Sequence, residues 1–159
     1  MMATFLASTL SHIYLPDLVN KFFRKLDQAF IYLMIVGSFS PFALTFMRTP
    51  LWLVFYTVVV IVSVCGFISK LAFGHRVDGI SVWLYVVLGI TQGLAMLSLM
   101  FLIPTLATIY VIAGGVCYLS GTYFLVSDIR RFRFHTIWHI LVLAGCAFHY
   151  FAIFHSLQA

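Results

Sequence analysis

The chain has 159 residues, of which 64% are hydrophobic and only 8% are charged. Because soluble domains carry about a quarter charged residues, this composition excludes an ordinary soluble domain and predicts an integral, multi-pass membrane protein. The length allows one compact helical bundle, so we expect a single domain over residues 1–159. The formal net charge of +5 is assigned to membrane orientation, not to nucleic-acid binding.

Five apolar stretches reach the roughly 17 residues that a membrane-spanning helix needs. They are residues 28–47, 51–69, 80–102, 105–126 and 136–156. Before them, residues 2–15 form a shorter apolar stretch, predicted to be a partial span, and residues 16–25 are polar and amphipathic, as in a segment along the interface. Period-two alternation is absent, and an open sheet cannot lie in lipid. The predicted fold class is therefore all-α: a polytopic transmembrane helix bundle with five full spans and one partial N-terminal span.

The basic residues are concentrated in three predicted loops that share one side of the membrane by span counting. Eight of the nine Lys and Arg residues lie there, and the exception, Arg48, lies in an intervening turn. Under the positive-inside rule these loops are cytoplasmic and the C-terminus is outside. The eight residues are Lys21, Arg24, Lys25, Lys70, Arg76, Arg130, Arg131 and Arg133.

Four ionisable residues beside these loops come from both ends of the chain and are expected at one depth: His12, Asp27, His135 and His139. His135 and His139 are spaced i, i+4 and would share a helix face, and Ser8 lies four residues before His12. Three imidazoles with an open position suit a catalytic zinc site, and a nearby carboxylate can transfer protons. Two alternatives stay open: the histidines can face lipid headgroups, and Asp27 can be a helix N-cap or first-turn acid.

Other polar or reactive residues in the apolar stretches favour packing roles. The cysteines Cys65, Cys117 and Cys146 have a spacing that matches no metal motif, and are expected to be small packing residues without disulfides. His149 is interpreted as a hydrogen-bonded interior histidine, with the lining of an interior path as the alternative. Gln92 is the one strongly polar residue deep in the middle spans, too little lining for a secondary transporter.

Taken together, the motif segments resemble the hemolysin III family, which belongs with the progestin and adipoQ receptors (PAQR), and the ordered pattern S-x3-H, D and H-x3-H is specific. The segments are Leu6–His12, Arg24–Gln28 with Gly37–Pro41, and His135–His139 with Val142–Gly145. The zinc-site pattern is also similar to that of the alkaline ceramidases. The resemblance implies a seven-helix family, a bacterial inner-membrane location, and an N-terminal truncation here. It also implies zinc on His12, His135 and His139, with Asp27 and Ser8 as the catalytic and supporting residues.

Two classes of function follow. The first is a zinc-dependent hydrolase of a lipid amide, ceramidase-like, whose lipid substrate enters laterally from the inner leaflet. The second is a non-catalytic cytolytic or membrane-homeostasis protein with structural zinc, or an inactive truncated member. Structural zinc usually has four protein ligands, and three histidines are present, which favours the open, catalytic site. The substrate and the oligomeric state are left open.

Overall fold

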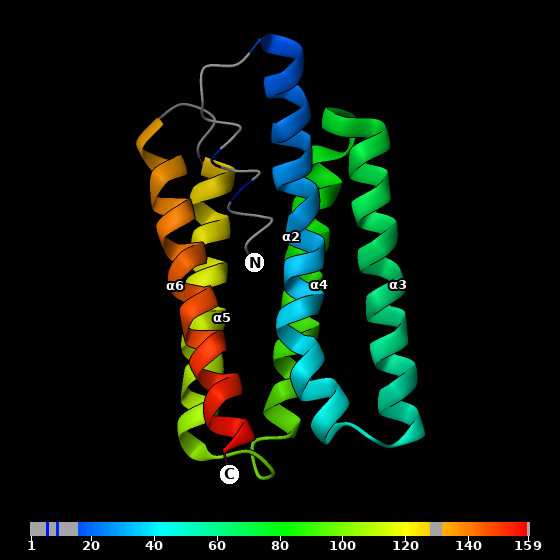
Figure 1. The fold of residues 1–159 in the computed structure, drawn as a ribbon, viewed down its shortest axis with the longest axis vertical. Coiled ribbons are helices and arrows are strands. Elements are labelled where there is room, and N and C mark those ends of the chain that lie inside the picture. Colours follow the sequence, from blue (N-terminus) through cyan, green and yellow to red (C-terminus); the bar gives the residue numbers. More distant parts are fainter. Residues whose placement is uncertain (1–5, 7–8, 10–15, 128–131, 159) are drawn as a thin grey trace. The chain divides into compact units, whose positions relative to one another are not determined.

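A computed structural model describes residues 6, 9, 16–127 and 132–158 (Figure 1). Within these ranges every regular element is helical, and five helices are long and apolar enough to cross a membrane. The prediction of an all-α polytopic helix bundle is thereby confirmed, while the partial span 2–15 falls almost entirely outside the described residues. The elements are α2 (Asp17–Phe46), α3 (Pro50–Phe73), the 3-10 helix η1 (Gly74–Val77), α4 (Asp78–Ser98), α5 (Thr105–Ser127) and α6 (Phe132–Leu157).

The helix bounds differ from the hydropathy prediction mainly where a helix carries polar residues. Residues 17–27 are helical and continuous with the first span, so α2 starts well before residue 28 and continues through Pro41. This segment contains neither Gly nor Pro and is rich in Leu, Lys and Phe, which a helix accepts. Hydropathy detects the membrane-crossing part of a helix and not its polar extension.

The predicted loop from Lys70 to Gly79 is mostly helical. Helix α3 begins with Pro50 after Thr49 and ends at Phe73, and it is capped by Gly74, whose backbone N–H donates to the Lys70 carbonyl. Gly74 has φ 57°, a left-handed value that glycine adopts without the Cβ penalty. Only the four residues of η1 separate α3 from α4. Lys70 and Asp78 are therefore helix-terminal residues and not loop residues.

The chain forms two compact units, which are described separately. Unit 1 holds residues up to Ala43 and Arg48–Tyr85, which means most of α2, all of α3 and η1, and the start of α4. Unit 2 holds Leu44–Met47 and Val86–Ala159, which includes the rest of α4 and both α5 and α6. The expectation of one domain over residues 1–159 stays a prediction.

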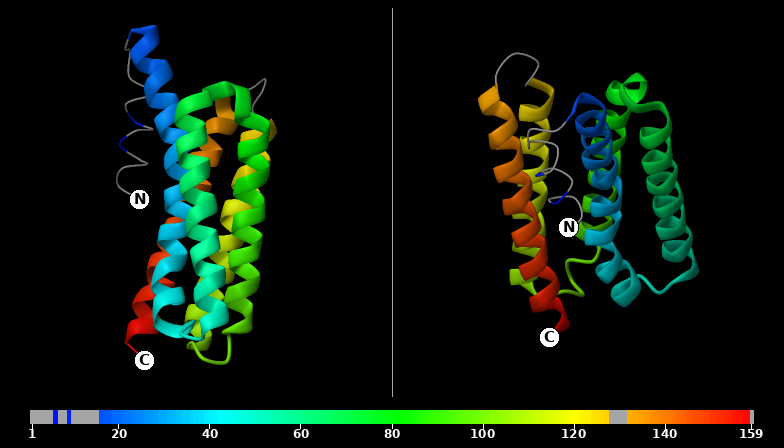
Figure 2. Two further views of the ribbon diagram at one scale, coloured as in Figure 1. Left: turned by 90° about the vertical axis from the view of Figure 1, so that its right-hand side faces the viewer. Right: turned by 45° about the horizontal axis from the view of Figure 1, so that its top comes forward.

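In unit 1, α3 runs back antiparallel to α2 (Figure 2) and buries one narrow stripe. The buried residues of that stripe recur at helical spacing: Val59, Ser63, Gly66 and Lys70. A Cβ at Gly66 would lie 2.5 Å from Tyr32 Cε1, so the absence of a side chain lets the tyrosine of α2 lie against the α3 backbone. Most of the remaining α3 surface is exposed and apolar, as lipid contact requires.

In unit 2, α5 and α6 are antiparallel partners (Figure 1) that approach closely at glycines. Gly114 of α5 makes room for the His149 ring of α6, and Gly145 of α6 makes room for the Tyr118 ring of α5. A Cβ at Gly145 would lie 2.8 Å from Tyr118 Cε1. Small residues at a membrane helix interface allow this van der Waals contact, which stabilises the pair where no hydrophobic driving force acts between helices.

Candidate metal and acid–base site

The predicted zinc ligands are only partly in the described part of the chain. Ser8 and His12 lie outside the described residues. His135 and His139 both belong to α6, so the helical condition for placing them one turn apart on one face is met. His139 is half-buried, and the side chain of His135 is not among those described. Among the described side chains no group of three potential ligands gathers, and the predicted zinc ligand set stays a prediction.

Asp27 lies inside α2 and does not cap it. The helix begins at Asp17, so Asp27 is in its third turn, beyond the N-terminal turn where the helix dipole favours an acid. The alternative interpretation of Asp27 as an N-cap or first-turn residue is therefore wrong, because the helix extends past the apolar span. The carboxyl group is half-buried and interacts electrostatically with Tyr85 of α4.

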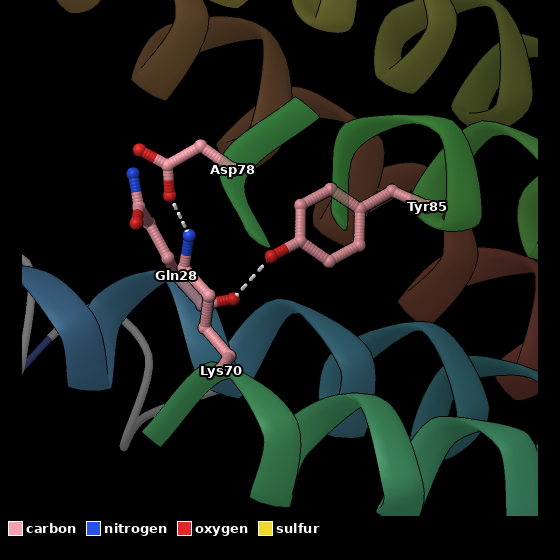
Figure 3. Close-up of polar contacts among 4 residues, drawn as sticks. All are labelled: Gln28, Lys70, Asp78 and Tyr85. Carbon is pink, nitrogen blue, oxygen red and sulfur yellow. Dashed lines mark hydrogen bonds and ion pairs between the residues drawn. The ribbon is translucent and has the colours of Figure 1, made fainter. Parts of the chain in front are cut away.

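A polar network in unit 1 includes Gln28, the residue after Asp27 in the chain (Figure 3). The Lys70 ammonium pairs with Asp78 Oδ1, and the Tyr85 hydroxyl donates to the backbone carbonyl of Gln28 at 2.7 Å. Lys70 is only 1% exposed, whereas the Asp78 side chain is 45% exposed. The network joins all three helices of the unit, since Gln28 is on α2, Lys70 on α3, and Asp78 and Tyr85 on α4.

Helix geometry favours the Lys70–Asp78 pair. Lys70 is in the last turn of α3 and Asp78 is in the first turn of α4, so each charge complements the dipole of its own helix. The buried Lys70 ammonium needs its partner, because an uncompensated charge in a low-dielectric environment is strongly unfavourable. The pair therefore stabilises the tight α3–η1–α4 connection.

Further polar side chains lie near this network in the interior of unit 1. Tyr32 and Tyr85 are both buried, with ring centroids 4.6 Å apart, and buried Ser81 interacts with both phenol groups. Gln28 Oε1 and Ser63 Oγ are buried without a hydrogen-bond partner. Buried polar atoms are normally satisfied, so this part of unit 1 is unusually polar for the interior of a membrane helix bundle.

The sequence pattern does not indicate this network, for identifiable reasons. Lys70 was counted as a loop cation, although Gly74 four residues later is a helix C-cap signal that would have placed it in the last turn of α3. Asp78, just beyond the turn, is then a helix-start acid. The contact between Tyr85 and Gln28 joins residues 57 apart, and no local pattern indicates it.

The polar residues of unit 2 are arranged differently. Both ring nitrogens of His149 are buried and have no hydrogen-bond partner by strict geometry, although the Val111 backbone is close enough to interact with the ring. The burial of the ring agrees with the prediction for His149, and its hydrogen bonding stays a prediction. The α5 surface presents Gly114 and the edge of the Tyr118 ring at this level, and the ring centroids of Tyr118 and His149 are 5.2 Å apart.

The cysteines follow the packing prediction only in part. Cys65, Cys117 and Cys146 form no disulfide, as expected. Cys146 is buried and its sulfur accepts a hydrogen bond from the Tyr118 hydroxyl at 3.3 Å. Cys65 is exposed on α3 and so does not pack within this chain.

Comparison with known proteins places these residues in a family context. The family model described as "Haemolysin-III related" matches residues 1–150. "Hemolysin-3" of Bacillus cereus is 31% identical over 153 residues, which cover 96% of this chain and 69% of that protein. A "Hemolysin-3 homolog" of Bacillus subtilis (strain 168) is 28% identical over 153 residues, covering 96% of this chain and 71% of the relative. No solved structure matches the chain.

Proposed function

Since the chain belongs to the haemolysin-III related family, we propose that it is an integral membrane zinc protein that hydrolyses an amide bond of a membrane lipid in the manner of a ceramidase. The observation that carries this proposal is the position of His135 and His139, four residues apart within the single helix α6. The family match spans all five proposed site residues: Ser8, His12, Asp27, His135 and His139.

The donor set fits zinc. Imidazole nitrogens are preferred zinc ligands, and a catalytic site keeps a position open beside three protein ligands; here the three would be His12, His135 and His139. Zinc, when bound, supplies Lewis acidity and lowers the pKa of a coordinated water. Asp27 accepts a proton from the attacking water and returns it to the leaving amine, and the Ser8 hydroxyl donates a hydrogen bond to the substrate carbonyl oxygen.

The position of Asp27 supports this role. A half-buried carboxylate in the middle of α2 is costly, and the helix dipole does not compensate it. Ionisable residues at such positions in membrane helices are functional candidates by default. Asp27 is therefore the residue of unit 1 that is best suited to transfer protons.

We place the site on the cytoplasmic side of a bacterial inner membrane, with the C-terminus outside. Lys21 and Arg24 on α2 and Arg76 on η1 are all exposed, as expected for loop and helix-end cations under the positive-inside rule. The lipid substrate then enters from the inner leaflet, between helices that already contact membrane lipids.

The first experiment measures zinc in the purified, detergent-solubilised protein by elemental analysis. We expect about one zinc ion per chain, lost in the His135→Ala/His139→Ala double variant, because three histidines bind one ion. His155, near the other end of α6, provides a matched control, and His155→Ala should retain the metal. A folded wild-type protein without zinc would contradict the proposal.

The second experiment separates metal binding from catalysis. Asp27→Asn should retain zinc and lose lipid amide hydrolysis by about a hundredfold or more, since proton transfer typically contributes that much. Release of fatty acid from ceramide in mixed micelles measures the rate. Unchanged hydrolysis in Asp27→Asn would exclude Asp27 as the acid–base residue.

Membrane lysis without catalysis is a second candidate, favoured by the name Hemolysin-3 that the Bacillus cereus relative carries. In that case zinc ties helices together and serves no reaction. Haemoglobin release from erythrocytes separates the two functions: lysis that persists in Asp27→Asn, together with bound zinc and no detectable hydrolysis in the wild type, would support the lytic role.

A further inference from the structure

The carbonyl of Gln28, the residue after Asp27, has an unusual partner for a group inside a helix. It accepts a hydrogen bond from the Tyr85 hydroxyl at 2.7 Å, from a different helix. Tyr85 is 7% exposed and lies against Tyr32, which fits against the bare backbone of Gly66. Three helices thus hold the Tyr85 phenol in place, and the phenol in turn holds the turn of α2 that carries Asp27.

Two carboxylates also act electrostatically on Tyr85. Both Asp27 and Asp78 interact with it electrostatically, but Asp78 is paired with the buried ammonium of Lys70 (Figure 3). The negative charge that Asp78 presents to Tyr85 therefore depends on Lys70. Without Lys70, two carboxylates would act on one phenol, and like charges in a partly buried region favour protonation of one another.

We infer that Tyr85 is a positioning residue for Asp27, and that the Lys70–Asp78 pair sets the local field in which Asp27 transfers protons. This inference rests on the proposed function of Asp27. Among the described side chains, the other charged and titratable groups of these elements near Asp27 in the chain or in the network are Arg24, Lys25 and Tyr32 on α2, Lys70 on α3, Arg76 on η1, and Asp78 and Tyr85 on α4.

A purely structural network gives a different expectation. If the ion pair only joined α3 to α4, removing Lys70 alone or both partners together would have the same consequence for Asp27. If the pair acts through charge, removing Lys70 exposes Asp27 to the uncompensated charge of Asp78, and removing both partners restores neutrality. The two roles are therefore separated by Lys70→Met and Lys70→Met/Asp78→Asn.

The test measures modification of Asp27 by dicyclohexylcarbodiimide, which reacts with protonated carboxyl groups, by mass spectrometry of the peptide at pH 7. This readout requires neither bound zinc nor activity. Lys70→Met should raise the labelling of Asp27 by about threefold or more, and Lys70→Met/Asp78→Asn should return it to about the wild-type level. Asp78→Asn alone should lower the labelling, and this variant decides the result if Lys70→Met does not fold.

Kinetics test the positioning role of Tyr85. Tyr85→Phe should lower kcat by about tenfold through misorientation of Asp27, with KM and zinc content unchanged. Tyr56→Phe is the matched control, because the Tyr56 hydroxyl on α3 also donates a hydrogen bond to α2, at 2.8 Å to Ser40 Oγ. Ser40 lies far along α2 from Asp27, so this variant should leave kcat unchanged.

The outcomes are distinguishable. Equal labelling of Asp27 in the wild type, Lys70→Met and the double variant would overturn the inference, and so would equally raised labelling in both variants. A wild-type protein that hydrolyses no lipid would contradict the proposed function, while the labelling of Asp27 would still decide whether the Lys70–Asp78 charges act on it.

Discussion

The two units of this chain hold their helices together by different interactions. Unit 1 uses side-chain polar contacts between elements: Lys70 with Asp78, Tyr85 with the Gln28 carbonyl, and Tyr56 with Ser40. Unit 2 joins α5 to α6 through rings placed over glycines, with one weak Tyr118–Cys146 hydrogen bond to sulfur. In lipid the hydrophobic effect does not drive helices together, so either hydrogen bonds or close packing must do so.

This difference bears on the proposed role of Asp27. The packing of rings against glycines has a structural role that needs no ligand, since shape complementarity stabilises the helix pair. A buried lysine, a paired carboxylate and an interhelical tyrosine bond are more than packing requires, because polar groups inside a membrane are costly. Unit 1 therefore contains a polar network next to the turn of α2 that carries the proposed acid–base residue, Asp27.

The largest expected effect is on the packing of unit 2. In Gly114→Ala the new Cβ would lie 2.6 Å from His149 Nε2 and 3.2 Å from the Gly145 carbonyl oxygen, so the buried His149 ring, the α6 backbone or both must shift. We expect a loss of about 3 kcal/mol in the free energy of unfolding, measured by SDS titration in mixed micelles. Gly115→Ala is the control, because nothing lies within 4 Å of its Cβ position; equal losses in both variants would contradict the packing model.

A smaller loss is expected when the ion pair of unit 1 is broken. Lys70→Met leaves the partly exposed carboxylate of Asp78 without its partner, and should cost about 2 kcal/mol of unfolding free energy in the same titration. The double variant Lys70→Met/Asp78→Asn should recover much of this loss, because a neutral pair carries no desolvation penalty. A double variant as unstable as Lys70→Met would show that charge is not the reason for the loss.

The smallest effect has the opposite sign. His149→Leu removes two buried ring nitrogens that have no hydrogen-bond partner, so the variant should be more stable by about 1 kcal/mol. Thermal unfolding in detergent provides the measurement. Destabilisation by a similar amount would mean that the imidazole makes a favourable polar interaction within unit 2, and would remove the contrast between the two units.

The proposed site illustrates which features a sequence pattern can indicate. His135 and His139 were placed on one helix from their spacing alone, and α6 contains both. The apolar pattern predicts that Asp27 opens a span, but α2 already begins at Asp17, because hydropathy does not register the polar turns of residues 17–27. Lys70 was assigned to a loop, since a lysine after an apolar stretch resembles one that has left the membrane.

Hydropathy, charge order and short-range spacing were sufficient for the helical class, the five spans and the family resemblance. These properties depend on local composition, because each span must satisfy its own backbone hydrogen bonds in lipid. The contacts of Tyr85 with the Gln28 carbonyl, of Tyr32 with Gly66, and of His149 with Gly114 were decided only by the tertiary structure. Such contacts depend on the rotation and register of packed helices, and side chains far apart in the sequence set these through their shapes.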